Sequence, residues 1–233
     1  MKSKIWTQKF VDIIWNPFDH KSQDLFIEEA SSVLNEVFKK YDKLQNKYRS
    51  DERSAEKAIW MLHLDGLDTL RDCLALLKEK KHRIVGKLSR DITEVLDLAA
   101  LFWWERDKGS RRLKKWYDDK VIRHCEFREY LGSSRGKEFQ EYSARMYSDL
   151  SKWTHHCYSV LLNSYSLAGD NGEMLVYHSH TEALISPHTI SQYMWEIKDL
   201  IFYFLSNIKM VGLIDWAELV CFLNKQRLGL KFI

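Results

Sequence analysis

Residues that break helices are scarce in this chain of 233 residues. Proline occurs only at Pro17 and Pro187, and there are 9 glycines. Either residue inside a helix destabilises the helix relative to alanine. Leu, Lys, Glu and Ala, which are common here, favour helix formation. The chain is therefore expected to fold into long α-helices.

Apolar residues recur at spacings of three and four along most of the chain, which is the period of one helix face. This pattern predicts long helices at about 22–48, 52–80, 82–106, 139–164, 188–210 and 213–225, shorter ones within 113–131, and an arm helix at 4–15. Glycine and serine predict a linker at 132–136, and a loop is expected at 166–173, before a strand-like piece at 174–180. The sequence therefore predicts an all-α multi-helix bundle with at most one small β-hairpin near 174–180.

No internal repeat, low-complexity tract or long linker divides the chain, so a single helical domain over 1–233 is the economical interpretation. Within it we expect an N-terminal arm at 1–20, a bundle at 21–167 and C-terminal helices at 188–225.

Two local features predict how helices pack. The seam from Ile27 to Tyr48 alternates spacings of three and four, so it should be buried against another helix of this chain or of a partner. Together with 9 tryptophans, this seam predicts a homodimer. Gly66 lies in the middle of a predicted helix, where glycine is costly, and it is expected to mark a close helix crossing.

Charge, cysteines and hydropathy restrict the class of protein. The net charge of +3 is too small to imply nucleic-acid binding by itself. Cys73, Cys125, Cys157 and Cys221 form no CxxC pair, and reduced cysteines are expected. The N-terminus lacks the pattern of a signal peptide, and the longest apolar runs are far too short to span a membrane. We therefore expect a cytoplasmic protein without a membrane partner.

The predicted helix at 139–164 carries two polar edges beside its apolar stripe. One edge consists of Tyr147, Ser151 and His155, and the other of Arg145, Asp149, Lys152 and His156. Ser151 and His155 could share a proton, as a nucleophile and its base do, but the sequence places no third orienting group. The other edge offers cations suited to phosphate or RNA, although Arg145 and Asp149 also match an ordinary ion pair on a solvated face.

Arg90 and Glu94 lie opposite the apolar stripe of the predicted helix at 82–106. Arg preceding Glu at this spacing is the less favourable order within one helix, which slightly favours pairing with another helix, although an ordinary surface ion pair is the stronger alternative. We predict that both residues face His155 across one helix–helix groove. In a structural version Glu94 accepts hydrogen bonds from His155 and Arg90; in a catalytic version the groove is open and His155 reaches a phosphate.

His178, His180 and His188 form the only histidine pattern compatible with a metal, and a fourth ligand is not evident. No phosphate-binding glycine loop, HExxH or GxSxG motif is present. The sequence therefore predicts no cofactor and disfavours enzymes built on nucleotide-binding folds.

Three segments resemble a family of bacterial all-helical proteins of unknown function: LSRDITEVLDLA at 88–99, LKKWYDDKVIRHCEFREYLG at 113–132 and YSDLSKWTHHCYSVLLNSY at 147–165. The shared pattern is an R-x3-E helix, an L-x-K-W-Y segment and a Y-x2-L-S-x3-H helix. That family is in turn similar to the HEPN superfamily of helical bundles, many of which are dimeric and act as metal-independent ribonucleases. The HEPN motif places His four to six residues after Arg, whereas nine residues separate Arg145 from His155 here.

Two hypotheses remain open from the sequence. The first is a non-enzymatic interaction or regulatory module, for which a second copy of the chain, an RNA or another protein is the expected partner. The alternative, implied by the resemblance, is an HEPN-like ribonuclease or nucleotide-acting protein of toxin or phage-defence type. In that alternative His155 or His156 is the acid or base and Arg145 holds the phosphate.

Overall fold

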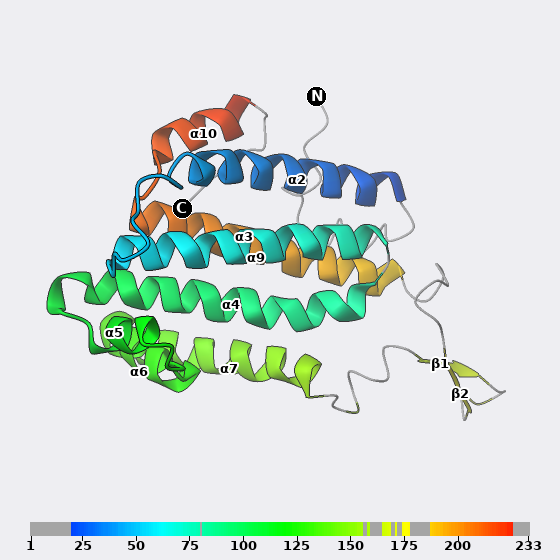
Figure 1. The fold of residues 1–233 in the computed structure, drawn as a ribbon. Helices are drawn as coiled ribbons and strands as arrows, with labels where there is room; N and C mark the ends of the chain where they lie inside the picture. The colour runs from blue at the N-terminus through cyan, green and yellow to red at the C-terminus, as the bar shows by residue number, and fades with distance from the viewer. Residues whose placement is uncertain are drawn as a thin grey trace.

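The computed structural model describes residues 20–79, 81–155, 158, 165–168, 171, 174–177 and 187–225. More than half of the chain is α-helical, and the strands in the described part form one antiparallel pair (Figure 1). The predicted all-α bundle with one small β-hairpin is therefore confirmed.

The elements follow one another along the chain as a series of helices with one hairpin. The helices are α2 (His20–Asp42), α3 (Ala55–Lys78), α4 (His82–Glu105), α5 (Arg111–Tyr117), α6 (His124–Arg135), α7 (Lys137–Thr154), α9 (Pro187–Val211) and α10 (Trp216–Lys225). A short 3-10 helix, η2 (Arg106–Lys108), follows α4. Strand β1 (Tyr165–Ala168) pairs with β2 (Met174–Tyr177), with Tyr165 opposite Tyr177.

The linker predicted at 132–136 is wrong, because α6 continues to Arg135 and only Gly136 separates it from α7. Gly136 has a φ of 96°, a backbone conformation that residues other than glycine rarely adopt. Gly132 lies inside α6, and a Cβ atom there would lie 2.6 Å from Cβ of Gln140. Its small size therefore permits two consecutive helices to pack closely, rather than opening a loop.

Several other boundaries also differ from the sequence pattern. Helix α2 ends at Asp42, whereas the pattern predicted a helix as far as Tyr48. Helix α7 ends at Thr154 with His155 as its C-cap, whereas the pattern predicted a helix as far as Ser164. The loop predicted at 166–173 is wrong in its first part, because 165–168 forms β1. Helix α3 begins after Ser54, whose hydroxyl accepts a hydrogen bond from the amide of Lys57. The arm helix predicted at 4–15 lies outside the described residues.

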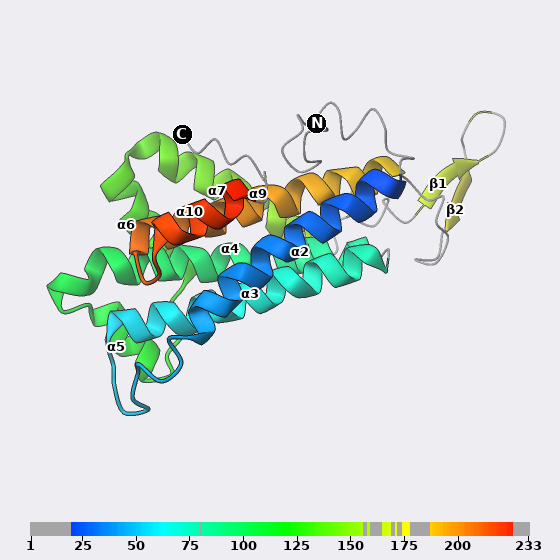
Figure 2. The same cartoon turned by 90° about the horizontal axis from the view of Figure 1, so that it is seen from above.

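Helix α4 is the central element of the bundle. It packs against α3 and α9 on one side and against α6 and α7 on the other, as Figure 1 shows for α3 and α7. From above, α2 crosses over α3, and α10 lies beside α2 (Figure 2). One cluster of buried side chains joins α2, α3, α4, α9 and α10, and a second joins α3 and α4 to α6.

The seam predicted on the first helix is buried within this chain. Ala30, Leu34, Val37 and Tyr41 are fully buried in the cluster that α2 shares with α3 and α9. The seam therefore has its partner inside the molecule and leaves the predicted homodimer to other surfaces. That assembly stays a prediction.

No helix among the described residues combines the length and the apolar character that crossing a bilayer would require. Of the four cysteines, Cys73 is a buried free thiol, and Cys125 and Cys221 are exposed free thiols. Cys157 lies outside the described residues.

The close helix crossing predicted at Gly66 is confirmed. A Cβ atom at Gly66 would lie 3.3 Å from Cγ1 of Val95 on α4 and 3.8 Å from Cε2 of Phe204 on α9. Three helices therefore approach one another at a position where no side chain intervenes.

Replacing Gly66 by valine is expected to lower the free energy of unfolding by about 2 kcal/mol, because two further methyl groups enter a packed crossing. Asp65→Val is the matched control, since Asp65 is exposed on the same helix. Aspartate and valine have similar helix propensities, so this change should alter the free energy of unfolding by less than about 0.5 kcal/mol. Urea unfolding measures both. Equal losses in the two variants would contradict a close crossing.

Candidate functional site

A row of polar side chains runs along the face of α4 that meets α6 and α7. Arg90, Glu94 and Asp97 are spaced by four and three residues, so they lie on one side of the helix. Arg90 and Glu94 are partly buried and Asp97 is buried. Polar groups in such positions need partners, and α6, α7 and α9 supply them.

Arg90 and Glu94 form a closed set of hydrogen bonds with α7. Arg90 donates from Nε to Oε1 of Glu94 at 2.8 Å, from one terminal nitrogen to the hydroxyl of Thr154 at 2.9 Å, and from the other to the hydroxyl of Tyr147 at 2.5 Å. The Tyr147 hydroxyl donates in turn to Oε1 of Glu94 at 2.9 Å. The guanidinium carbon also lies 4.8 Å from the centre of the Tyr147 ring. The ion pair within α4 is therefore fastened to α7 through one tyrosine.

Burial, followed by the hydrogen bond to Glu94, raises the pKa of Tyr147. A tyrosine is protonated at neutral pH even at its ordinary pKa of about 10, so the phenol can donate to Glu94, and the raised pKa extends this to higher pH. The arrangement is suited to holding α4 and α7 in register. It contains a cation, a carboxylate and a phenol, but each is already engaged by the others.

Asp97 continues the polar row into a second, more deeply buried set. Nε2 of His124 on α6 lies 3.2 Å from Oδ2 of Asp97, and Tyr203 on α9 donates to Oδ1. The His124 side chain is only 7% exposed and stacks on the Tyr147 ring, with a centroid distance of 3.7 Å and an angle of 10° between the planes. The stacked rings connect the two sets, and Nδ1 of His124 has no hydrogen-bond partner among the described residues.

The candidate residues from the sequence divide into those that meet and those that do not. Arg90 and Glu94 face α7 as predicted, but the group that Glu94 accepts from is Tyr147, where His155 was expected. His155 is exposed at the C-cap of α7, and the hydroxyl of Ser151 donates to the carbonyl of Tyr147 at 2.7 Å. Arg145 is exposed on α7.

Other candidates lie beyond the described residues. These are His156, His178 and His180, and the side chain of His188 at the start of α9. Within the described ranges, no three His, Cys, Asp or Glu side chains are grouped so that they could hold a metal ion.

Sequence reasoning missed His124, Thr154 and Tyr203 as members of the site. Asp97 carried a usable signal, because it continues the row of Arg90 and Glu94 by a further turn. Nothing local marks His124 or Tyr203, which become partners of Asp97 only through the way α6 and α9 pack.

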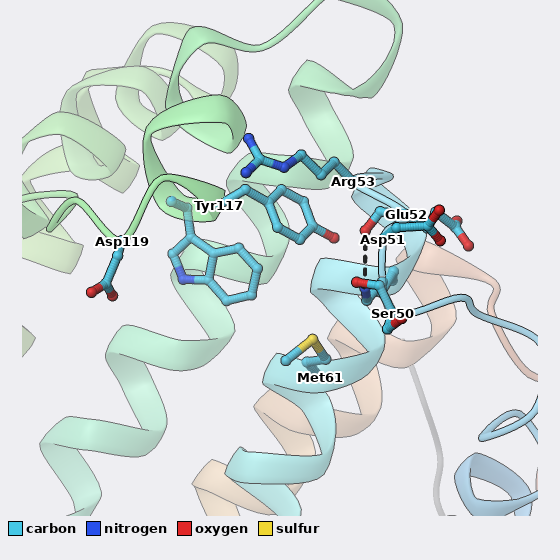
Figure 3. Close-up of a pocket in the computed structure, with 9 residues that line it drawn as sticks. Ser50, Asp51, Glu52, Arg53, Met61, Tyr117 and Asp119 are labelled. Carbon is cyan, nitrogen blue, oxygen red and sulfur yellow. Dashed lines mark hydrogen bonds between the residues drawn. The ribbon is translucent and has the colours of Figure 1, made fainter.

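A separate hollow of about 570 Å³ lies between the start of α3 and α5 (Figure 3). Its charged side chains are engaged in fastening the loop before α3. Arg53 donates to Asp118 at 2.7 Å, and Nζ of Lys57 donates to three backbone carbonyls of that loop at 2.7 to 2.9 Å. The hydroxyl of Tyr117 donates to the carbonyl of Ser54 at 2.8 Å. These side chains hold the loop before α3 in place, and the hollow is the outer surface of that loop.

One ionisable group in the core stands apart from both sites. Burial raises the pKa of Glu196 on α9 to about 7, the nearby Asp199 adds to the rise, and a hydrogen bond from Ser89 of α4 offsets part of it. Oε1 of Glu196 is buried and has no hydrogen-bond partner among the described residues. The carboxyl group therefore titrates near neutral pH inside the α4–α9 contact.

Comparison of the chain with known proteins identified no relative. No protein-family model, no curated protein and no solved structure matches the chain. The class that the fold and the site define is an all-α bundle whose central helix is tied to its neighbours by a polar row.

Removing the hydroxyl of Tyr147 tests the α4–α7 fastening. Tyr147→Phe is expected to lower the free energy of unfolding by about 1–2 kcal/mol, because Glu94 and Arg90 each lose a partner in a partly buried position. Tyr130→Phe is the control, since its hydroxyl makes an exposed 3.2 Å bond to the carbonyl of Trp104. Chemical denaturation measures the free energy of unfolding of both variants. An equally small decrease in both would mean that the hydrogen bonds among Arg90, Glu94 and Tyr147 do not stabilise the fold.

From the raised pKa of Glu196 we expect the free energy of unfolding to depend on pH in a specific way. Its pKa in the folded protein, about 7, exceeds the ordinary value of 4.5, so the folded state holds a proton that the unfolded state releases. The resulting stabilisation is complete below about pH 4.5 and is lost as the pH rises through 7, a change of about 3 kcal/mol.

The test is the difference between the wild type and Glu196→Gln, measured by denaturation from pH 4 to pH 8. The variant is expected to gain stability relative to the wild type as the pH rises, with the difference levelling above pH 7. Glu28→Gln, on the exposed face of α2, is the control. A difference that stays constant with pH would refute the buried titration.

Proposed function

We propose that this protein is a non-enzymatic helical interaction module, in which the polar row of α4 holds the bundle together. The observation that carries the proposal is the mutual saturation of Arg90, Glu94, Tyr147 and Thr154. A catalytic or phosphate-binding arginine needs hydrogen-bond donors directed at a substrate. Here all three nitrogens of the guanidinium donate to neighbouring side chains.

The positions of Arg145 and His155 also support this proposal over an HEPN-like ribonuclease. With nine residues between them, the two positions lie about 15 Å apart along a helix axis. This spacing differs from the four to six residues between Arg and His in the HEPN motif, and the difference weighs against the ribonuclease alternative. His155 is exposed at the helix end, where a histidine needs no chemical role.

A module of this kind acts through its outer surface. Several large apolar side chains are exposed, among them Met61, Trp104 and Val121. They are candidates for contact with a protein partner, with RNA or with a second copy of the chain. The homodimer predicted from the sequence belongs to this proposal.

Incubating the protein with labelled RNA in the presence of EDTA tests the proposal, because the chelator silences contaminating metal-dependent nucleases. Intact RNA is expected for the wild type and for His155→Ala. The substitution should change the free energy of unfolding by less than about 0.5 kcal/mol, as for an exposed surface residue. Metal-independent cleavage by the wild type that disappears in His155→Ala would establish the ribonuclease alternative.

A further inference from the structure

Charge is distributed unevenly over the molecule. Residues 106–123, which we call the basic segment, contain eight Lys and Arg residues and three Asp residues, a net charge of +5. The whole chain carries +3, so the other 215 residues together carry −2. The basic segment comprises η2, α5 and the connection to α6, and Figure 1 shows α5 near the same end of the bundle as the end of α4.

The fold uses only part of this charge. Arg112 pairs with the buried Glu105, and Lys115 lies 3.6 Å from Glu126, so these two cations fasten α5 to α4 and α6. Arg106 stacks on Trp103, with its guanidinium carbon 3.6 Å from the ring centre. The other cations of the segment take part in none of these contacts.

Five exposed cations remain: Lys108, Arg111, Lys114, Lys120 and Arg123. None of them forms an ion pair within 4 Å with a residue that the structure describes. Asp118 does lie near two of them, and its pKa is lowered first by the hydrogen bond from Arg53 and further by Lys114 and Lys120. That carboxylate is already bound to Arg53, so the surplus of positive charge is not cancelled. Like charges gathered in this way repel one another, which favours binding of an anion.

The side chains between the cations distinguish a polynucleotide from a membrane. Val121, 87% exposed, is the one exposed aliphatic side chain among the described positions of the segment, while Leu113 and Ile122 point into the core. A segment that binds a bilayer needs an apolar face beside its cations. Trp104 is 41% exposed and lies about one helical turn before Lys108. Cations with a neighbouring exposed indole match the phosphates and bases of a single strand.

We infer that the basic segment, together with Trp104, is a binding surface for single-stranded nucleic acid. The inference rests on the proposed function as an interaction module and names its partner. The exposed cations neutralise backbone phosphates, and the indole of Trp104 offers a face on which a base stacks. Because the contacts are to the backbone and to ring faces, RNA and DNA strands bind comparably.

The first experiment measures fluorescence anisotropy of a labelled RNA of about 20 nucleotides over a salt series from about 50 mM. The variant K108Q/R111Q/K114Q/K120Q is compared with K39Q/K43Q/K78Q/K87Q, which removes four exposed lysines elsewhere and changes the net charge equally. The segment variant is expected to lose at least tenfold in affinity and to flatten the salt slope by up to about 3. The control variant should lose less than about threefold. Equal losses, or no binding by the wild type at the lowest salt, would overturn the inference.

The second experiment separates the kinds of ligand. Trp104→Ala is expected to weaken binding of single-stranded RNA and of oligo(dT) by about five- to tenfold, because one stacked base is lost, and to leave duplex binding unchanged. Equal effects on single strands and duplex would overturn the assignment to single strands. Binding to phosphatidylserine vesicles without binding to RNA would make the partner a membrane and would also overturn it.

The same mixtures, run on a denaturing gel, distinguish the two proposals. Strands that are bound and remain intact support both. Strands that are bound and cleaved contradict the non-enzymatic proposal but leave the binding surface in place. Strands that are neither bound nor cleaved contradict the binding surface alone.

Discussion

A buried chain of hydrogen bonds fixes the relative positions of the four main helices. His63 on α3 is fully buried, with Nδ1 2.6 Å from the Tyr41 hydroxyl of α2 and Nε2 2.9 Å from Oδ1 of Asn207 on α9. Asn207 donates from Nδ2 to the carbonyl of Leu96 on α4 at 3.0 Å, so its oxygen faces the imidazole and Nε2 carries the proton. Sliding any of these helices by one residue would leave a buried polar group unpaired, at a cost of about 1–3 kcal/mol.

With its inner face fixed in this way, α4 cannot turn its polar row to solvent. Arg90, Glu94 and Asp97 are stabilised because the neighbouring helices bring partners to them: Tyr147 from α7, His124 from α6 and Tyr203 from α9. Among the described residues, the polar groups of this row are therefore engaged with one another and with the neighbouring helices. The binding surface that we propose lies instead among the outer elements, where the connection from α4 to α6 concentrates positive charge.

The features that the sequence predicted correctly are those that depend on spacing within one segment. Helix α4 was placed within a residue of its observed bounds, and Gly66 was identified as a crossing because glycine is costly in a helix without such a reason. The errors have a common physical cause. Gly132 was interpreted as a linker and His155 as the partner of Glu94, and both outcomes depend on which neighbour packs there. Periodicity within one segment shows on which face of a helix a residue lies, but it does not show which residue of another helix packs against it.

Two buried groups in the core titrate over the same range of pH with opposite effects on stability. Burial lowers the pKa of His63 to about 4 from 6.5, so its contribution is lost as the pH falls from 6.5 to 4. Burial raises the pKa of Glu196 to about 7 from 4.5, so its contribution is lost as the pH rises from 4.5 to 7. Each change is of the order of a few kcal/mol, and the two are opposite in direction, so they partly cancel across the interval. The bundle therefore contains a neutral imidazole and a carboxyl group whose pH-dependent contributions to stability oppose each other, so the part of either group appears in the difference between the wild type and a variant that lacks it.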